Sequence, residues 1–416
     1  MSSLTRSAPL AVVVLAAAAL AAPIPASADP IDTITQNREV FSPDGTITRV
    51  DVTIPVNDSP APAAQVRTAA VTPIIYNGPT DQKLDIVVVG DGYTAGELGV
   101  YAEHANSKIA ELFSVEPYHS YADQFNVWMV DVVSNESGVD NDPLGVNRDT
   151  ALDMYFYCGG LDRLLCVNET KANQYAAQAP DVDQVLALAN TGTYGGAGGG
   201  VATSAGGNPS SGQIVVHELG HSIGGLADEY DYADGDTYTG PELFEPNVSI
   251  KDEATQQAEQ VKWWQWMGQP TPDGGVIGTF DGARYWLHGI HRPSQDSIMR
   301  TLGREFNLVG REAMVAAFHD HAAVAGSSIP DGAVVTTEAL PTVILPDTPG
   351  GHRIVWWVDG QEITGAAGET TLDPRLLDDI DDPHRIRATV VDTTDWVRDP
   401  VLRAQRLTVS FHWTLP

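Results

Sequence analysis

The chain has 416 residues, of which 43% are hydrophobic and 19% are charged, which excludes disorder along its whole length. At about 100–200 residues per domain, the length predicts two or three folded units. With 55 acidic and 23 basic residues, the net charge is −32. This charge repels the phosphates of nucleic acids and anionic lipids, so we expect neither a nucleic-acid partner nor a membrane partner.

Residues 1–28 have the pattern of a secretory signal peptide. Arg6 precedes an apolar run over residues 10–22, and Ala26-Ser27-Ala28 supplies the small residues of a cleavage site. The alternative is a membrane anchor, but this run of about 13 residues is shorter than the roughly 20 that span a bilayer. We therefore predict a secreted, extracellular protein whose mature chain starts near Asp29.

Residues 29–72 are predicted to form a short β-ribbon followed by a linker. Polar and apolar residues alternate over 46–54, as in a half-buried strand, and Pro43-Asp44-Gly45 is typical of a turn. Residues 59–72 are rich in proline and alanine, which is typical of a linker. The ribbon fits a pro-segment or a remnant of an accessory domain, and the sequence leaves both open.

Residues 73–330 are predicted to form the largest domain, of class α/β or α+β. The unbroken apolar strand at 84–89 indicates a sheet that is covered on both faces. A helix at 95–113 and strands at 125–133 and 185–189 are also expected, so strands and helices alternate. The glycine run at 194–200 lacks the nucleotide-binding pattern, and we interpret it as a mobile loop beside a cleft. We expect the strand near 201–204 to form the upper edge of this cleft.

Two further features concern the cysteines and the C-terminal part. An oxidising environment favours a local disulfide between Cys158 and Cys166, the two cysteines of the chain. Residues 331–416 are predicted to form an all-β, immunoglobulin-like sandwich. Its strands are expected near 354–358, 386–391 and 406–411, which are rich in β-branched and aromatic residues.

The segment His217-Glu218-Leu219-Gly220-His221 contains the pattern H-E-x-x-H. Residues four apart share one face of a helix, so His217 and His221 can bind the same ion. Glu218 lies beside that face, where its carboxylate can take a proton from a metal-bound water. The pattern therefore predicts one catalytic zinc ion, with two histidine ligands and Glu218 as the general base.

A third protein ligand would leave the fourth coordination position to water. Asp228 is the favoured candidate and Glu229 the alternative, because both carboxylates follow a glycine turn at 224–225. A distant ligand such as His288 or His291 stays open. Asp228 would in that case hold a ligand histidine through a hydrogen bond.

These residues together resemble the IgA-peptidase family, a metzincin-like group of secreted zinc metallopeptidases sometimes called igalysins. The resemblance covers about residues 80–325 and is most specific over 217–230. Supporting segments lie at 89–94, 194–199, 280–285, 291–293 and 297–300. The resemblance implies a metzincin-like fold and an endopeptidase that acts on a protein or peptide substrate.

The resemblance also implies roles for residues outside the helix. Met299 is expected in a tight turn beneath the metal, and Tyr285 or Tyr230 is a candidate for stabilising the oxyanion of the reaction. The acidic stretches 228–236 and 378–382 are weaker candidates for structural calcium, because neither has EF-hand spacing.

A catalytically silent metal-binding protein and a zinc hydrolase of another bond, such as an amidase, are the alternative functions. The sequence leaves the substrate and the oligomeric state open.

Overall fold

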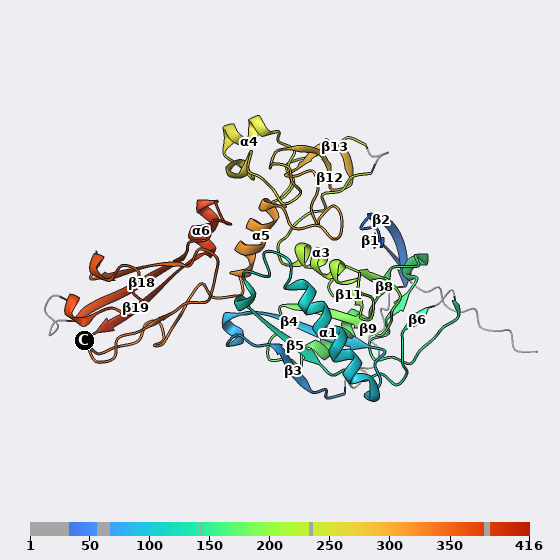
Figure 1. The fold of residues 1–416 in the computed structure, drawn as a ribbon, viewed down its shortest axis with the longest axis horizontal. Coiled ribbons are helices and arrows are strands. Elements are labelled where there is room, and N and C mark those ends of the chain that lie inside the picture. Colours follow the sequence, from blue (N-terminus) through green and yellow to red (C-terminus); the bar gives the residue numbers. More distant parts are fainter. Residues whose placement is uncertain (1–32, 56–66, 142–143, 233–235, 378–382) are drawn as a thin grey trace, which may run out of the picture.

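The structure is a computed structural model that describes residues 33–55, 67–141, 144–232, 236–377 and 383–416. The predicted signal peptide, most of the predicted linker and the acidic stretch 378–382 lie outside these residues. The described part is a mixed α+β structure (Figure 1). Within these ranges, no helix is both long and apolar enough to cross a membrane.

A six-stranded sheet forms the centre of the main body, with the strand order β10-β11-β9-β4-β5-β3. The four inner strands are parallel, and the two edge strands β3 and β10 are antiparallel to their neighbours. The strands are β3 (Val71–Ile75), β4 (Leu84–Asp91), β5 (Phe125–Val130), β9 (Gln184–Ala189), β10 (Gly196–Ala197) and β11 (Ala202–Ala205). The predicted strands at 84–89, 125–133 and 185–189 are thus confirmed.

Helices cover both faces of this sheet. In β4, Ile86 and Val88 belong to the core that contains α1 (Leu98–Leu112) and α3 (Gly212–Ser222). Val87 and Val89 belong to a second core with α2 (Glu169–Ala176) on the opposite face. All residues of β4 are therefore buried, which explains the apolar run at 86–89 within it.

Two small sheets border the main body. The first is the N-terminal hairpin of β1 (Thr33–Phe41) and β2 (Ile47–Pro55), which pairs with no strand of the central sheet. The second comprises β6 (Asp140–Asn141), β7 (Tyr155–Phe156) and β8 (Leu165–Cys166). The predicted disulfide between Cys158 and Cys166 is present and closes a loop between β7 and β8.

A loop-rich segment lies on the other side of α3 from the central sheet (Figure 1). It contains α4 (Glu253–Glu259) and the antiparallel pair β12 (Phe280–Ala283) and β13 (Trp286–Arg292). The chain then enters α5 (Leu308–Phe318), which packs into the main core.

The C-terminal part has a core of its own around Trp356 and Trp413. Its main sheet is antiparallel with the order β17-β16-β18-β19. The elements are β14 (Gly326–Ser327), β15 (Val343–Ile344), β16 (His352–Val358), β17 (Gln361–Glu362), β18 (His384–Asp392), α6 (Pro400–Arg406) and β19 (Thr408–Leu415). The strands predicted near 354–358 and 386–391 are confirmed, whereas α6 was not expected. The immunoglobulin-like sandwich stays a prediction.

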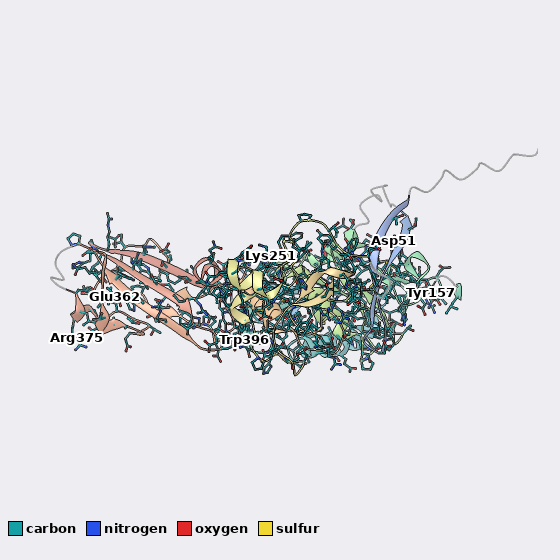
Figure 2. The ribbon with its side chains drawn as sticks, turned by 90° about the horizontal axis from the view of Figure 1, so that it is seen from above. Asp51, Tyr157, Lys251, Glu362, Arg375 and Trp396 are labelled. Carbon is teal, nitrogen blue, oxygen red and sulfur yellow. A yellow bond between two sulfur atoms is a disulfide. The ribbon has the colours of Figure 1, made fainter. Side chains whose placement is uncertain are left out.

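Figure 2 shows how the two ends of the molecule differ. Glu362 and Arg375 of the C-terminal part lie at one end, and Asp51 of the hairpin and Tyr157 beside the disulfide lie at the other. The N-terminal hairpin lies near α3, whereas the C-terminal sheet lies far from it (Figure 1).

Candidate metal centre

Helix α3 presents His217 and His221 on one face, with their Nε2 atoms 3.1 Å apart. His217 Nδ1 lies 2.9 Å from the carbonyl oxygen of Ile298, and His221 Nδ1 lies 2.7 Å from that of Leu226. Because a carbonyl oxygen only accepts hydrogen bonds, each Nδ1 carries the proton and donates it. In the neutral form of each ring, Nε2 is then the unprotonated nitrogen, which is the tautomer that metal binding requires.

The chain reverses direction directly after α3. Gly225 has a φ angle of +59°, a left-handed conformation that glycine adopts at little cost. Leu226 N then donates a hydrogen bond to Gly220 O over 3.2 Å. The segment after the turn therefore runs back along the last turn of the helix and brings Asp228 to the two histidines.

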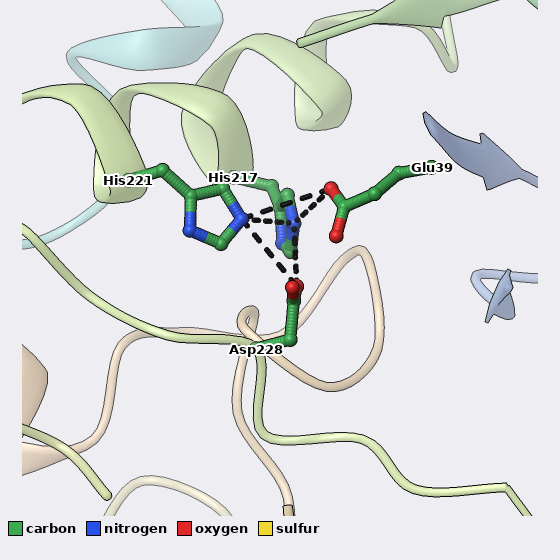
Figure 3. Close-up of side chains that lie close together, drawn as sticks. All are labelled: Glu39, His217, His221 and Asp228. Atoms are coloured by element: carbon green, nitrogen blue, oxygen red, sulfur yellow. Dashed lines mark hydrogen bonds and ion pairs between the residues drawn. The ribbon is translucent and has the colours of Figure 1, made fainter. Parts of the chain in front are cut away.

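Two carboxylates complete a group of four side chains (Figure 3). Asp228 Oδ1 lies 3.4 Å from Nε2 of both histidines. Glu39, which comes from strand β1, places Oε2 3.3 Å from His217 Nε2 and 3.7 Å from His221 Nε2. Among the described residues this is the one group of His, Cys, Asp and Glu that is arranged to hold a metal ion.

The four donor atoms fit a tetrahedral metal ion. Ligand atoms about 2.0–2.1 Å from a zinc ion in such a site are about 3.3 Å from one another. The donor separations given above run from 3.1 to 3.7 Å. When both rings are neutral, all four atoms are hydrogen-bond acceptors, so they repel one another unless a metal ion or a proton lies between them.

Protons compete with a metal for this position. Burial lowers the pKa of His217, but the hydrogen bonds with Asp228 and Glu39 outweigh burial and raise the pKa to about 10. Burial also lowers the pKa of His221, and Asp228 and Glu39 again raise it well above the usual value. The two carboxylates therefore favour positive charge at the centre of the group.

Glu218 lies beside this group and lines the same cleft. Its side chain is buried, and its Oε1 has no hydrogen-bond partner among the described residues. Burial, and after it the negative charge of Glu39, raises the pKa of Glu218 to about 7. A Cβ atom at Gly198 would overlap this carboxylate, so the glycine run provides the space that Glu218 needs.

Glu229, the alternative third ligand, is engaged elsewhere. Its oxygens accept hydrogen bonds from Asn247 at 2.9 Å, from Ser297 at 2.8 Å and from Asn307 at 3.0 Å. Its backbone N–H donates to Met299 O over 2.7 Å. Glu229 therefore ties the segment after α3 to the turn that contains Met299. Sequence reasoning missed both asparagines, because no local pattern marks them.

Met299 lies in a turn in which the N–H groups of Arg300 and Thr301 both donate to Ser297 O over 2.9 Å. Its sulfur packs against the helix, since a Cβ atom added at Gly220 would come within 2.8 Å of it. Gly220 lies between the two histidines in the sequence. Met299 therefore packs beneath the turn of α3 that carries them and is not one of the four donor residues.

The two candidate tyrosines contact the two carboxylates. Tyr285 Oη donates to Asp228 Oδ2, and Tyr230 Oη donates to Glu39 Oε1 over 2.8 Å. The distant alternatives for the third ligand, His288 and His291, are not members of the group of four. His288 Nδ1 instead lies 2.6 Å from Asp281 Oδ2.

The group lies in a cleft of about 710 Å³. The cleft is lined by residues of the hairpin, by residues 198–200 of the glycine run, and by Glu245, Arg284 and Tyr285. The strand that borders the cleft was expected near 201–204. In the structure this strand, β11, is internal, and the edge strand is β10 within the glycine run.

Comparison with known proteins identifies the family of the chain. No curated protein matches it. The family described as IgA Peptidase M64 matches residues 72–273 and 269–318, which is more than half of the chain. The matched region contains His217, Glu218, His221 and Asp228, whereas Glu39 lies outside it. The chain therefore belongs to the IgA peptidase M64 family and is a metallopeptidase.

Proposed function

We propose that this chain is a secreted, zinc-dependent endopeptidase. The observation that carries the proposal is the convergence of His217, His221 and Asp228 on one point, with the buried carboxylate of Glu218 beside it. When bound there, a zinc ion supplies a Lewis acid that polarises a water molecule and the carbonyl group of the substrate.

Three side chains would hold this ion, and each is oriented by a further contact. His217 and His221 are fixed by carbonyl groups on their Nδ1 side. Asp228 is fixed by Tyr285, whose hydroxyl donates to the carboxylate oxygen that does not face the histidines. Such contacts on the outer side of the ligands tune both the geometry and the metal affinity. Met299 would support the histidine-bearing turn from below.

Glu218 would act as the general base and then as the general acid. It would accept the proton of the attacking water and deliver it to the leaving amine. A carboxyl group with a pKa of about 7 suits both steps at neutral pH, because it exchanges protons readily in that range.

The oxyanion of the reaction needs a hydrogen-bond donor as well as the metal. Tyr285 donates its hydroxyl proton to Asp228, a proposed ligand, whereas Tyr230 donates to Glu39, which is not one of the three proposed ligands. Tyr230 is therefore the better candidate of the two. An extended substrate would lie along residues 198–200 of the glycine run, because this segment lines the cleft next to the metal centre.

The arrangement of the main body supports a metzincin-like fold for the catalytic domain. Its parallel sheet ends in an antiparallel edge strand beside the cleft, and the helix with the H-E-x-x-H pattern packs on that sheet. Residues 331–416 are proposed to form an immunoglobulin-like accessory domain. Structural calcium at the acidic stretches is a minor part of the proposal, and Asp231 there pairs with Arg300 instead.

Metal content and casein hydrolysis, measured on the chain and on Glu218→Ala, test the proposed function. Because Glu39 lies at the metal centre, the same pair should also be compared in chains that carry Glu39→Ala. We expect about one zinc ion per chain throughout, and casein hydrolysis that depends on Glu218.

A zinc-loaded chain without any casein hydrolysis in either background would contradict an endopeptidase and favour a silent metal-binding protein. Hydrolysis limited to small amides would instead indicate an amidase. Hydrolysis that persists in Glu218→Ala would contradict the role of this residue.

A further inference from the structure

We propose that the N-terminal hairpin is a built-in inhibitor of the metal centre, and that Glu39 acts as the fourth metal ligand. The inference concerns the regulation of the site assigned above and therefore rests on the proposed function. A catalytic zinc site needs an open fourth position for water or substrate. In this chain a carboxylate of the protein itself takes that position.

The carboxylate of Glu39 lies at the distance from the histidines that is expected of a metal ligand. Its Oε2 is as close to His217 Nε2, at 3.3 Å, as Asp228 Oδ1 is, at 3.4 Å. Its other oxygen accepts the hydrogen bond from Tyr230 over 2.8 Å. The carboxylate is thus held at both oxygens. Glu39 also accepts the hydrogen bond of the Tyr230 hydroxyl group, which the reaction would need to stabilise the oxyanion.

Apolar packing holds Glu39 in place. Phe41, two residues further along β1, is 1% exposed and meets the ring of His217 edge-on, with ring centroids 5.5 Å apart. Ile47 at the start of β2 is buried in the same core. Residues two apart point to the same face of a strand, so the contacts of Phe41 direct Glu39 toward the histidines as well.

The hairpin is anchored at both ends. At its turn, Leu302 N donates to Gly45 O over 2.9 Å, close to the turn that contains Met299. Toward its other end, Val52 packs against Cys158, so tightly that a Cβ atom at Gly159 would overlap it. The hairpin therefore spans the cleft from the methionine turn to the disulfide loop.

The hairpin also covers the glycine segment at 198–200 along which a substrate would lie. Arg38, the residue before Glu39, donates a hydrogen bond to the carbonyl oxygen of Gly198 beside β10. A substrate that lies along residues 198–200 would need the space that β1 takes, since Arg38 and these glycines line the same cleft. Two adjacent residues of β1 thus block different parts of the site: Glu39 blocks the metal position, and Arg38 blocks the segment along which a substrate would lie.

The hairpin can leave this position without disrupting the catalytic core. Its strands form a separate two-stranded sheet and pair with no strand of the central sheet. A two-stranded hairpin is only marginally stable by itself, so it depends on docking. The match to the peptidase family starts at residue 72, after the hairpin. The inhibitory element is thus an addition to the part of the chain that defines the family.

Binding of acetohydroxamate, which needs an open position on the metal, tests this inference. We propose to titrate it into the full chain loaded with Co²⁺, whose absorption spectrum reports the coordination of the ion. We expect Glu39→Ala to bind acetohydroxamate at least about tenfold more tightly than the unaltered chain, because the open state is a minor state there. Glu39→Gln keeps the size of the side chain, and its affinity for acetohydroxamate should lie between those of Glu39→Ala and the unaltered chain.

Asp51→Ala is the matched control. Asp51 is an exposed carboxylate on the same hairpin, where its Oδ1 accepts a hydrogen bond from Asn37 at 2.7 Å. We expect this variant to bind acetohydroxamate as the unaltered chain does.

Three outcomes would separate the inference from the proposed function. Equal hydroxamate affinity in all four proteins, with metal bound, would overturn the inhibitory role and leave the proposed function standing. Loss of metal from both Glu39 variants would make Glu39 a ligand that the site requires, and would also overturn the inference. Absence of metal from the unaltered chain would contradict the proposed function itself.

Discussion

Two regions bring donor atoms to the same metal centre, and they do so by different means. The segment from His217 to Asp228 supplies three donors, positioned by one turn of α-helix and one glycine turn. The hairpin supplies one donor, Glu39, from 178 residues before His217, and side-chain packing holds it there. We infer that the first region determines metal affinity and the second determines access to the metal.

The largest effect is expected for Asp228→Asn, which keeps the shape of the side chain and removes a charged ligand. Zinc affinity should fall by more than the roughly 10–100-fold that is typical when only the hydrogen-bond partner of a ligand is lost. Competition with a chromogenic chelator measures this affinity. A fall no larger for Asp228→Asn than for Glu39→Ala would mean that the two regions do not divide their tasks as inferred.

Glu229→Ala is expected to destabilise the protein rather than empty the metal site directly. Asn247, Ser297 and Asn307 would each lose a buried acceptor. The cost should be about 3 kcal/mol or more in the free energy of unfolding. Urea unfolding of the metal-free protein measures it. Unchanged stability with complete loss of metal would instead make Glu229 the ligand.

Tyr230→Phe tests the residue that connects the two regions. In chains with Glu39→Ala, where the hydroxyl of Tyr230 is available to substrate, the change should lower kcat by about 100-fold and leave KM nearly unchanged. Steady-state kinetics with a peptide substrate separate the two constants. Tyr285→Phe is the comparison, because loss of its bond to Asp228 should lower metal affinity instead. The assignment fails if KM rises and kcat stays the same.

Phe41→Ala should have the smallest effect on metal affinity, because Phe41 supplies no donor atom and its loss weakens the docking of the hairpin. Truncation of a buried phenylalanine to alanine typically removes about 3–5 kcal/mol of packing free energy. The hairpin should therefore leave its docked position more often. Hydrogen exchange of the backbone amides of β1 and β2 should then become faster, while exchange in β4 stays slow. Equal acceleration in β4 would show that the hairpin is part of the catalytic core.

The features that could be predicted from the sequence are the local ones. The apolar run of β4 and the H-E-x-x-H pattern of α3 each follow from residues close together in the chain. The position of Asp228 was also expected, because only a glycine turn separates it from the helix. The choice between Asp228 and Glu229 could not be made this way, since it depends on where Asn247 and Asn307 lie.

The hairpin shows the limit of such reasoning. Its strands, its turn and its possible identity as a pro-segment were open to prediction, because alternation and turn residues are local signals. Nothing near Glu39 marks it as a neighbour of His217. The edge position of β10 was likewise misjudged, because a strand of two residues within a glycine run has no recognisable pattern.

The sequence by itself determined the family, the helix that carries two histidines and Glu218, and the disulfide between Cys158 and Cys166. All of these depend on short spacings, along which the backbone geometry leaves few alternatives. Only the tertiary structure decided that Glu39 faces the metal centre and that Glu229 does not. Both outcomes depend on contacts between distant segments, and such contacts follow from how the whole core packs.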